Sequence, residues 1–169
     1  LKATTVTTSG KVIMNIGQSL DFKVSINPTN ASIKNLKWSC SDTSILTVTD
    51  KGYSGSTAIA AITAKKAGTV TLKYTAKDGS GVYGYVKVTV QPLVSSISLE
   101  SSKVISLTNK TEIVKVTILP KDAGNQVLSW SSGNPDICDV DYSGRLIPKS
   151  LGVCTIYVKT TDGSNLSGE

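Results

Sequence analysis

The sequence contains no histidine, so the residues of this chain that could do chemistry are three cysteines and the side chains of Asp, Glu, Lys and Tyr. Without histidine there can be no Ser-His-Asp or Cys-His relay and no His-ligated metal site. The three cysteines form no CxxC pair, and three thiolates are too few for an all-cysteine zinc site. The phosphate-binding sequences GxxxxGKS/T and GxGxxG do not occur either. We therefore expect a protein without catalytic activity, cofactor or metal.

Two of the cysteines could form a disulfide. Cys138 and Cys154 lie on neighbouring strand candidates, and their bond would close a loop of 16 residues. Closing such a loop is worth about 3 kcal/mol in the chain-entropy model. The alternative is two small buried thiols in adjacent core positions. Cys40 is two residues from Trp38, on the same side of an expected strand, and is expected to be a buried thiol.

The elements that position these residues are revealed by an internal repeat. Ile26-Asn27-Pro28 recurs as Ile118-Leu119-Pro120 and Trp38-Ser39 as Trp130-Ser131, each 92 residues later. Farther on, the register slips, and Gly68 aligns with Gly152 at an offset of 84. The first copy thus carries eight extra residues, near 53–60. We predict two homologous domains, 1–92 and 93–169.

The hydrophobic pattern has a period of two. Apolar residues alternate with polar ones through 20–26, 70–74, 86–90 and 114–118, and turn-forming residues separate these runs. Strict alternation marks strands with one buried and one solvated face. About seven short strands per copy are typical of an immunoglobulin-like sandwich. We predict an all-β chain of two tandem immunoglobulin-like Greek-key β-sandwiches.

The order of these motifs resembles a known family, the bacterial immunoglobulin-like domain of group 2. In each copy an alternating strand ends in Pro, and a Trp-Ser segment, a Gly-marked hairpin, a Gly-led apolar strand and Asp-Gly-Ser follow. The first copy supplies Ile26-Asn27-Pro28, Trp38-Ser39-Cys40-Ser41, Gly52, Gly68-Thr69-Val70-Thr71-Leu72 and Asp78-Gly79-Ser80. The second supplies Ile118-Leu119-Pro120, Trp130-Ser131-Ser132, Gly144, Gly152-Val153-Cys154-Thr155-Ile156 and Asp162-Gly163-Ser164.

The second copy departs from this pattern at its C-terminal strand. The first copy continues past Asp78-Gly79-Ser80 into the alternating segment 82–90, whereas the second reaches Glu169 soon after Asp162-Gly163-Ser164. A missing strand would leave an open sheet edge that favours pairing. We expect the strand to come from residues beyond Glu169 or from another subunit, unless residues 165–169 already begin it.

A calcium site is a further candidate in the second copy. The segment from Asp139 to Gly144, with Asp141 between them, imitates the start of a calcium-binding loop. The twelfth position of such a loop would be Ser150 instead of glutamate, and no helix flanks it. The family resemblance instead implies a hairpin turn that places Gly144 at its special backbone position, and we expect no metal.

Positive charge is concentrated in the first copy. Residues 1–92 contain 11 lysines and four acidic residues, whereas 93–169 contain seven basic and eight acidic residues. Six lysines could face an anionic glycan or cell-wall polymer: Lys34, Lys37, Lys65, Lys66, Lys73 and Lys77. The alternative is a solvated face that keeps the sandwich soluble. Nucleic acid is not expected, because the chain has one arginine and no aromatic-interleaved basic patch.

Tyr83 and Tyr85 are the best candidates for a contact patch. They are out of phase with the apolar residues of their strand and should point outward with Lys87, near Lys73. The tryptophans Trp38 and Trp130 could also be ligand-stacking platforms. Their alternating setting favours core plugs, like the buried Trp of other sandwiches.

The resemblance implies a scaffold or binding module outside the cytoplasm, on the cell surface or secreted. Three interpretations follow: a structural or adhesive stalk, an accessory module of a secreted glycoside-processing enzyme, or a virion tail or capsid-decoration domain. The partner would be an anionic glycan, a cell-wall polymer, a host surface protein or another domain of the same chain. No run approaches the roughly 18 apolar residues of a membrane span, so we expect no membrane insertion. The first residues lack the apolar run of a signal peptide, which suggests a mature or excised fragment.

Overall fold

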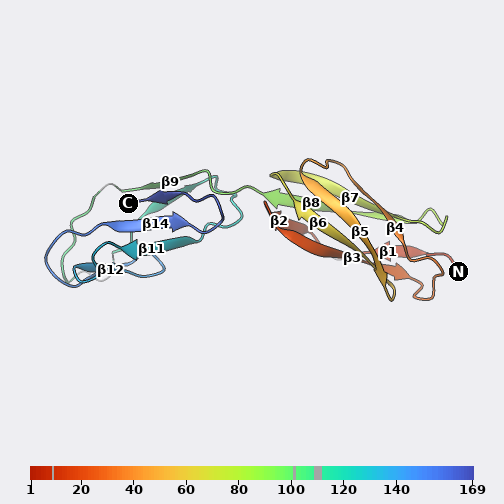
Figure 1. Ribbon diagram of the computed structural model, residues 1–169, viewed down its shortest axis with the longest axis horizontal. Coiled ribbons are helices and arrows are strands. Elements are labelled where there is room, and N and C mark those ends of the chain that lie inside the picture. The colour runs from red at the N-terminus through yellow and green to blue at the C-terminus, as the bar shows by residue number, and fades with distance from the viewer. Residues whose placement is uncertain (9, 101, 109–111) are drawn as a thin grey trace. The chain divides into compact units, whose positions relative to one another are not determined.

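The computed structural model describes all residues except 9, 101 and 109–111, and the described residues form strands and no helix (Figure 1). The predicted fold class is confirmed: the chain is all-β, with tandem immunoglobulin-like sandwiches. It divides into two compact units, Leu1–Pro92 and Leu93–Glu169, which are described separately below. The described part of the chain contains no helix that could cross a membrane.

The first unit consists of two four-stranded sheets, and all neighbouring strands are antiparallel except β2 and β8 (Figure 1). In the first sheet the order is β1 (Thr5–Thr7), β3 (Ser19–Asn27), β6 (Thr57–Ala64) and β5 (Leu46–Ser54). In the second it is β2 (Val12–Asn15), β8 (Tyr83–Gln91), β7 (Gly68–Ala76) and β4 (Leu36–Cys40).

The predicted alternation places apolar side chains of both sheets in one core. Val24 on β3, Leu72 on β7 and Val88 on β8 are each 0% exposed. Burying one such side chain stabilises the fold by roughly 1.5–3 kcal/mol. The aromatic part of this core is small, as the composition requires, and consists of Phe22 and Tyr74 with the half-buried Trp38.

The eight extra residues of the first copy lengthen one hairpin. β5 and β6 are nine and eight residues long, and they turn at Gly55, whose φ is +60°. The lengthened β6 pairs with β3 from Ser19 to Ser25 and places Ala58 and Ala60 in the interior. The insertion therefore extends a core sheet instead of forming a surface loop.

Among its described residues, the second unit has a counterpart for every strand of the first unit except β2. β9 (Ser96–Leu99) pairs with β10 (Val116–Leu119), and β12 (Cys138–Val140) pairs with β13 (Leu146–Pro148). The third sheet has the order β11 (Leu128–Ser132), β14 (Ile156–Thr160) and β15 (Ser167–Gly168). β15 pairs with β14, so residues of the 165–169 segment do begin a strand at the position of β8, which is one of the alternatives expected from the sequence.

The repeated glycine makes the same contact in both units. Gly68 and Gly152 have φ values of +151° and +149°, which L-residues rarely adopt. A Cβ on Gly68 would lie 2.7 Å from Cδ1 of Ile45, and a Cβ on Gly152 would lie 2.7 Å from Cδ1 of Ile137. At each position, therefore, both the backbone and the isoleucine require glycine.

The repeated aspartate also has the same role in both units. Asp78 accepts a hydrogen bond from the Ala3 backbone N at 2.5 Å, and Asp162 accepts one from the Val94 backbone N at 2.5 Å. Each carboxylate also accepts the backbone N–H two residues further on, at 2.9 Å. The Ser80 side-chain hydrogen bond, followed by those from the backbone, lowers the pKa of Asp78 to about 2. Each aspartate thus ties the start of its unit to a turn near the end.

Candidate functional site

The candidate site begins with the alternation of β8. Val86, Val88 and Val90 point into the core, so Tyr83 and Tyr85 point outward and are 59% and 65% exposed. The residue between them, Gly84, lies against the buried Tyr74 ring, where a Cβ would approach Cε2 to 2.5 Å. Glycine at this position lets the ring lie directly beneath the strand that carries the two exposed tyrosines.

Strand register places three lysines along a diagonal of this sheet and a fourth beside the end of that diagonal. Lys37 on β4 neighbours Thr75, two residues from Lys73 on β7. Lys73 is the partner of Tyr85 on β8, two residues before Lys87. Since diagonal neighbours on one face lie roughly 7–8 Å apart, successive lysines are separated by about that distance. The parallel pairing of Val12 with Val88 then places Lys11, just before β2, beside Lys87.

The two tyrosines border the lysine diagonal. On the neighbouring strands β8 and β7, Tyr83 lies directly opposite Thr75, and Tyr85 lies directly opposite Lys73. The Lys73 Nζ lies 4.5 Å from the centroid of the Tyr83 ring, in a cation–π contact. We call the outer surface of the β2-β8-β7-β4 sheet formed by these residues the lysine–tyrosine face: Lys11, Lys37, Lys73, Lys87, Tyr83 and Tyr85.

None of the four lysines makes an ion pair with a residue in the described ranges. Elsewhere in the first unit, by contrast, Lys51 lies 2.8 Å from Asp21 and Lys77 lies 3.6 Å from Asp50. Two acidic residues of this unit, Asp21 and Asp50, therefore pair with lysines outside the lysine–tyrosine face, and the lysines of the face have no ion-pair partner among the described residues.

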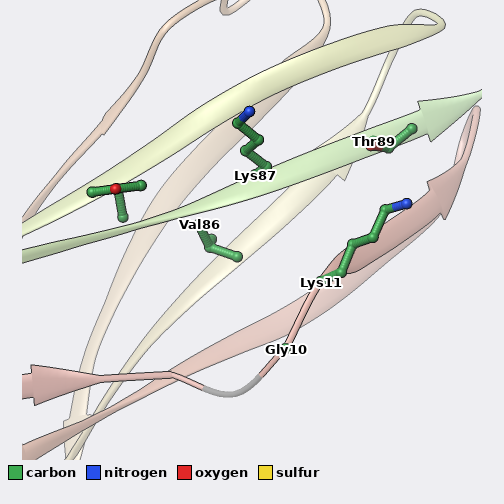
Figure 2. A pocket seen from close by; sticks show the side chains of 6 residues that line it. Gly10, Lys11, Val86, Lys87 and Thr89 are labelled. Carbon is green, nitrogen blue, oxygen red and sulfur yellow. The ribbon is translucent and has the colours of Figure 1, made fainter.

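One end of the lysine–tyrosine face is hollowed into an open groove (Figure 2). Lys11 and Gly10 come from the segment before β2, and Lys87 and Thr89 come from β8. The φ of +75° at Gly10 is the left-handed conformation that turns the chain into β2. Two ammonium groups thus flank the hollow from neighbouring segments.

The equivalent face of the second unit has different chemistry. The shared register places Ser129 where the first unit has Lys37, Tyr157 where it has Lys73, and Ser167 where it has Tyr83. By the same offset Lys159 replaces Thr75 and Glu169 replaces Tyr85, so this face has one tyrosine, one lysine and one carboxylate, which line an open hollow. Its strands β11, β14 and β15 correspond to β4, β7 and β8, and they pair with serine at the positions of Lys37 and Tyr83.

Some of the lysines grouped by sequence are separated in the structure. Lys37 and Lys73 lie on the lysine–tyrosine face, but Lys65 and Lys66 follow the end of β6, and Lys77 pairs with Asp50. Lys34 precedes β4, outside the sheet. Sequence reasoning missed Lys11, because its place beside Lys87 depends on parallel pairing that no local pattern reveals.

The tryptophans lie between the core and the surface. Trp38 is half-buried and packs against Phe22 and Tyr74, with ring centroids 6.1 and 5.9 Å away. Trp130 is half-buried beneath Gly144, where a Cβ would come within 2.7 Å of its ring. Both indoles pack within their own unit, as the side chains of core plugs would.

The cysteines are free thiols in the structure. Cys138 is buried, and burial raises its pKa, which disfavours the thiolate. The Cys154 Sγ lies 3.7 Å from the Cys138 carbonyl oxygen, so the two residues are neighbours. Their disulfide stays a prediction for an oxidising environment. Cys40 is half-buried beside the core of the other unit.

The acidic segment of the second unit forms a turn. Asp141 accepts hydrogen bonds from the Ser143 backbone N at 2.8 Å and the Arg145 backbone N at 3.0 Å. The Ser143 side chain and then the Arg145 backbone lower the pKa of Asp141. Asp139 lies 3.3 Å from Lys149 Nζ. Among the described residues no group of three or more His, Cys, Asp or Glu is placed to hold a metal.

Comparison with known proteins gives the chain a family context. Residues 2–86 match the bacterial Ig-like domain (group 2). An uncharacterized protein of Clostridium acetobutylicum is 29% identical over 167 residues, which are 97% of this chain and 16% of that protein. An Ig-like virion protein of Serratia phage KSP90 is 28% identical over 159 residues, which are 88% of this chain and 56% of that protein.

Two further similar proteins are an enzyme and a protein fragment of known structure. A 3-O-alpha-D-galactosyl-alpha-L-arabinofuranosidase of Bifidobacterium longum is 32% identical over 85 residues, which are 50% of this chain and 7% of that enzyme. Among solved structures, a C-terminal fragment of intimin in complex with a receptor domain has a TM-score of 0.49 and 18% identity, with 99% of this chain and 62% of that chain covered. The chain spans less than two thirds of the length of each relative named here.

Proposed function

The chain belongs to the family of bacterial Ig-like domains of group 2, and from this premise we propose that it is a non-catalytic structural and adhesive module of a larger bacterial surface or secreted protein. One observation carries the proposal: a relative matches 97% of this chain with only 16% of its own length. Such a match is typical of a module that serves within a longer protein. The lysine–tyrosine face supplies a surface on which the module can bind.

We further propose that the second unit is a second copy of the same family. Two contacts of the first unit, which recur at the corresponding residues of the second unit, support this proposal. Gly152 packs on Ile137 as Gly68 packs on Ile45. Asp162 accepts a hydrogen bond from the segment just before the first strand of its unit, as Asp78 does in the first unit. A tandem pair acts as a spacer, in which each sandwich adds length and the first carries the binding face.

Surface labelling tests this proposal. Antibodies raised against the 169-residue chain are applied to intact cells of the producing strain, before and after a brief external protease treatment. We expect labelling of intact cells that protease removes, or the antigen in the culture medium. Labelling only after the cells are permeabilised would contradict a role outside the cytoplasm.

Two relatives favour other settings for the same module. The match to the Serratia phage protein favours a virion, and the match to the Bifidobacterium enzyme favours an accessory module of a glycoside-processing protein. The same antibodies distinguish these settings, because a virion module co-sediments with purified particles and an enzyme module co-purifies with glycosidase activity.

A further inference from the structure

We propose that the lysine–tyrosine face binds an acidic polysaccharide, with sugar rings against Tyr83 and Tyr85 and anionic groups along the lysine diagonal. This inference rests on the proposed function, whose binding surface it specifies. The occupant is an extended glycan chain that carries negative charge at repeated positions. Four observations support it: the uncompensated charge, the exposed rings, the contrast with the second unit and the absence of arginine.

The lysines of this face have no ion-pair partner among the described residues. Lys11 and Lys87 come from neighbouring segments and line the same open hollow (Figure 2). Two acidic residues of the first unit pair instead with Lys51 and Lys77. A face lined by charges of one sign attracts the opposite sign. An anion bound at this hollow would be attracted by both ammonium groups.

The tyrosines add a surface suited to sugar rings. An exposed phenol offers a broad apolar ring and a polar hydroxyl at low conformational cost, which suits a ligand with both C–H and O–H groups. Tyr83 and Tyr85 lie two residues apart on one strand, and the Lys73 ammonium lies over the Tyr83 ring. The two rings therefore share one face with the lysine diagonal.

The second unit shows that these residues are not needed for folding. Ser129 and Ser167 stand on the equivalent strands where the first unit has Lys37 and Tyr83, and both strands still form. A sheet of this type therefore folds with serine at these positions. The lysines and tyrosines of the first unit are a property of its surface, not of its core.

The absence of arginine favours an acidic glycan over nucleic acid. Nucleic-acid recognition commonly uses the planar guanidinium, which stacks on bases and binds phosphate through two hydrogen bonds. The first unit contains no arginine, since the single arginine is Arg145. Lysine is a hydrated point charge on a flexible stem, which suits charges spaced along a flexible polymer.

The test measures binding of the whole 169-residue chain to four polymers by calorimetry at low and high salt. Polygalacturonic acid is the acidic polysaccharide, and dextran is the neutral one. Poly-glutamate is an anionic polymer without sugar rings, and single-stranded DNA represents nucleic acid. We expect saturable binding to polygalacturonic acid that weakens with salt, several-fold weaker binding to poly-glutamate and DNA, and none to dextran.

Substitutions then locate the site. Lys73→Gln and Lys87→Gln should each weaken binding about two- to fivefold, the range expected for single exposed charges. Tyr85→Thr keeps a strand-forming residue and should weaken polygalacturonic acid binding while leaving poly-glutamate binding unchanged. The matched control is Lys23→Gln, an exposed lysine on β3 of the other sheet, which should bind as the parent does. Thermal unfolding by circular dichroism confirms that each variant is folded.

Three results would overturn the inference. They are absence of binding to polygalacturonic acid, an equal loss in the Lys23→Gln control, and equal or tighter binding to poly-glutamate or DNA. Each of these leaves the proposed function standing if the antigen is found outside the cytoplasm. Conversely, a labelling result that places the protein inside the cell would refute the proposed function whatever the polymer binding shows.

Discussion

Every described strand of the second unit has a counterpart in the first, but the two units bury these strands to different extents. Val24 and Ile26 of the first unit are 0% and 1% exposed, whereas their counterparts Val116 and Ile118 are only half-buried. The alternation is the same in both segments. Alternation therefore decides which face of a strand turns inward, while the strands packed against that face decide how well it is buried.

The difference in depth follows from strand length. β5 and β6 are nine and eight residues long, but β12 and β13 are three residues each. In the first unit β6 pairs along β3, whereas among the described residues of the second unit only an isolated bridge, Ile113 with Arg145, joins the corresponding segments.

The largest expected difference between the units is in the cost of core substitutions. Leu72 is 0% exposed and its counterpart Ile156 is half-buried. Leu72→Ala should cost about 2–5 kcal/mol of unfolding free energy, the range for a fully buried aliphatic residue. Ile156→Ala should cost clearly less, because its side chain loses less buried area. Urea denaturation of the whole chain, with hydrogen exchange to assign each transition to its unit, measures both. Equal losses would contradict the difference in core depth.

Substitution of the corresponding glycines should lower the free energy of unfolding by a similar amount in each unit. Gly68→Ala and Gly152→Ala each place a Cβ against an isoleucine at a positive φ, and such strain costs about 1–3 kcal/mol. The same denaturation experiment should show the first unit destabilised by one variant and the second unit by the other, to similar extents. A loss in only one unit would mean that the two contacts are not equivalent.

The smallest effect is the pH dependence of the shared aspartates. The folded first unit holds the pKa of Asp78 at about 2, below the roughly 3.9 of an unperturbed Asp. A lowered pKa stabilises the fold above about pH 4, and this stabilisation is lost as pH falls from about 4 to about 2. Asp78→Asn should therefore lower the thermal midpoint at pH 7, and the gap from the parent should narrow as the pH falls over that range.

Asp162→Asn supplies the matched variant. Burial raises the pKa of Asp162, but hydrogen bonds from Ser164 and Val94 lower it by more, so its net shift is also downward. Its effect should have the same sign and appear in the second unit. A gap that widens on acidification for either variant would show that the carboxylate does not act through these hydrogen bonds.

Local patterns predicted the faces of the strands, but not the partners across them. The period of two in 82–90 is enough to place Tyr83, Tyr85 and Lys87 together on the outer surface, because residues two apart on a strand share a face. Lys73 joins them through antiparallel register, which the alternation of β7 makes predictable. Lys11 does not, because its neighbour is set by a parallel pairing of segments about 75 residues apart, and such pairing depends on the whole fold.

The effect of the insertion was also beyond local reasoning. The repeat located the extra residues near 53–60, but not their use. Alanine has a low preference for strands, so Ala58 and Ala60 around Ile59 give only a weak prediction of a strand in this segment. Its pairing with β3 makes it part of a core sheet.

We propose that a glycan binds to the first unit and not to the second, and an NMR titration of the isotope-labelled 169-residue chain with oligogalacturonate tests this. We expect amide shift changes on β4, β7 and β8, centred on Lys73 and Tyr85, and in the segment before β2. Residues of β11, β14 and β15 should stay unchanged. Shift changes centred on the second unit, or spread evenly over both units, would show that the lysine–tyrosine face is not the binding site.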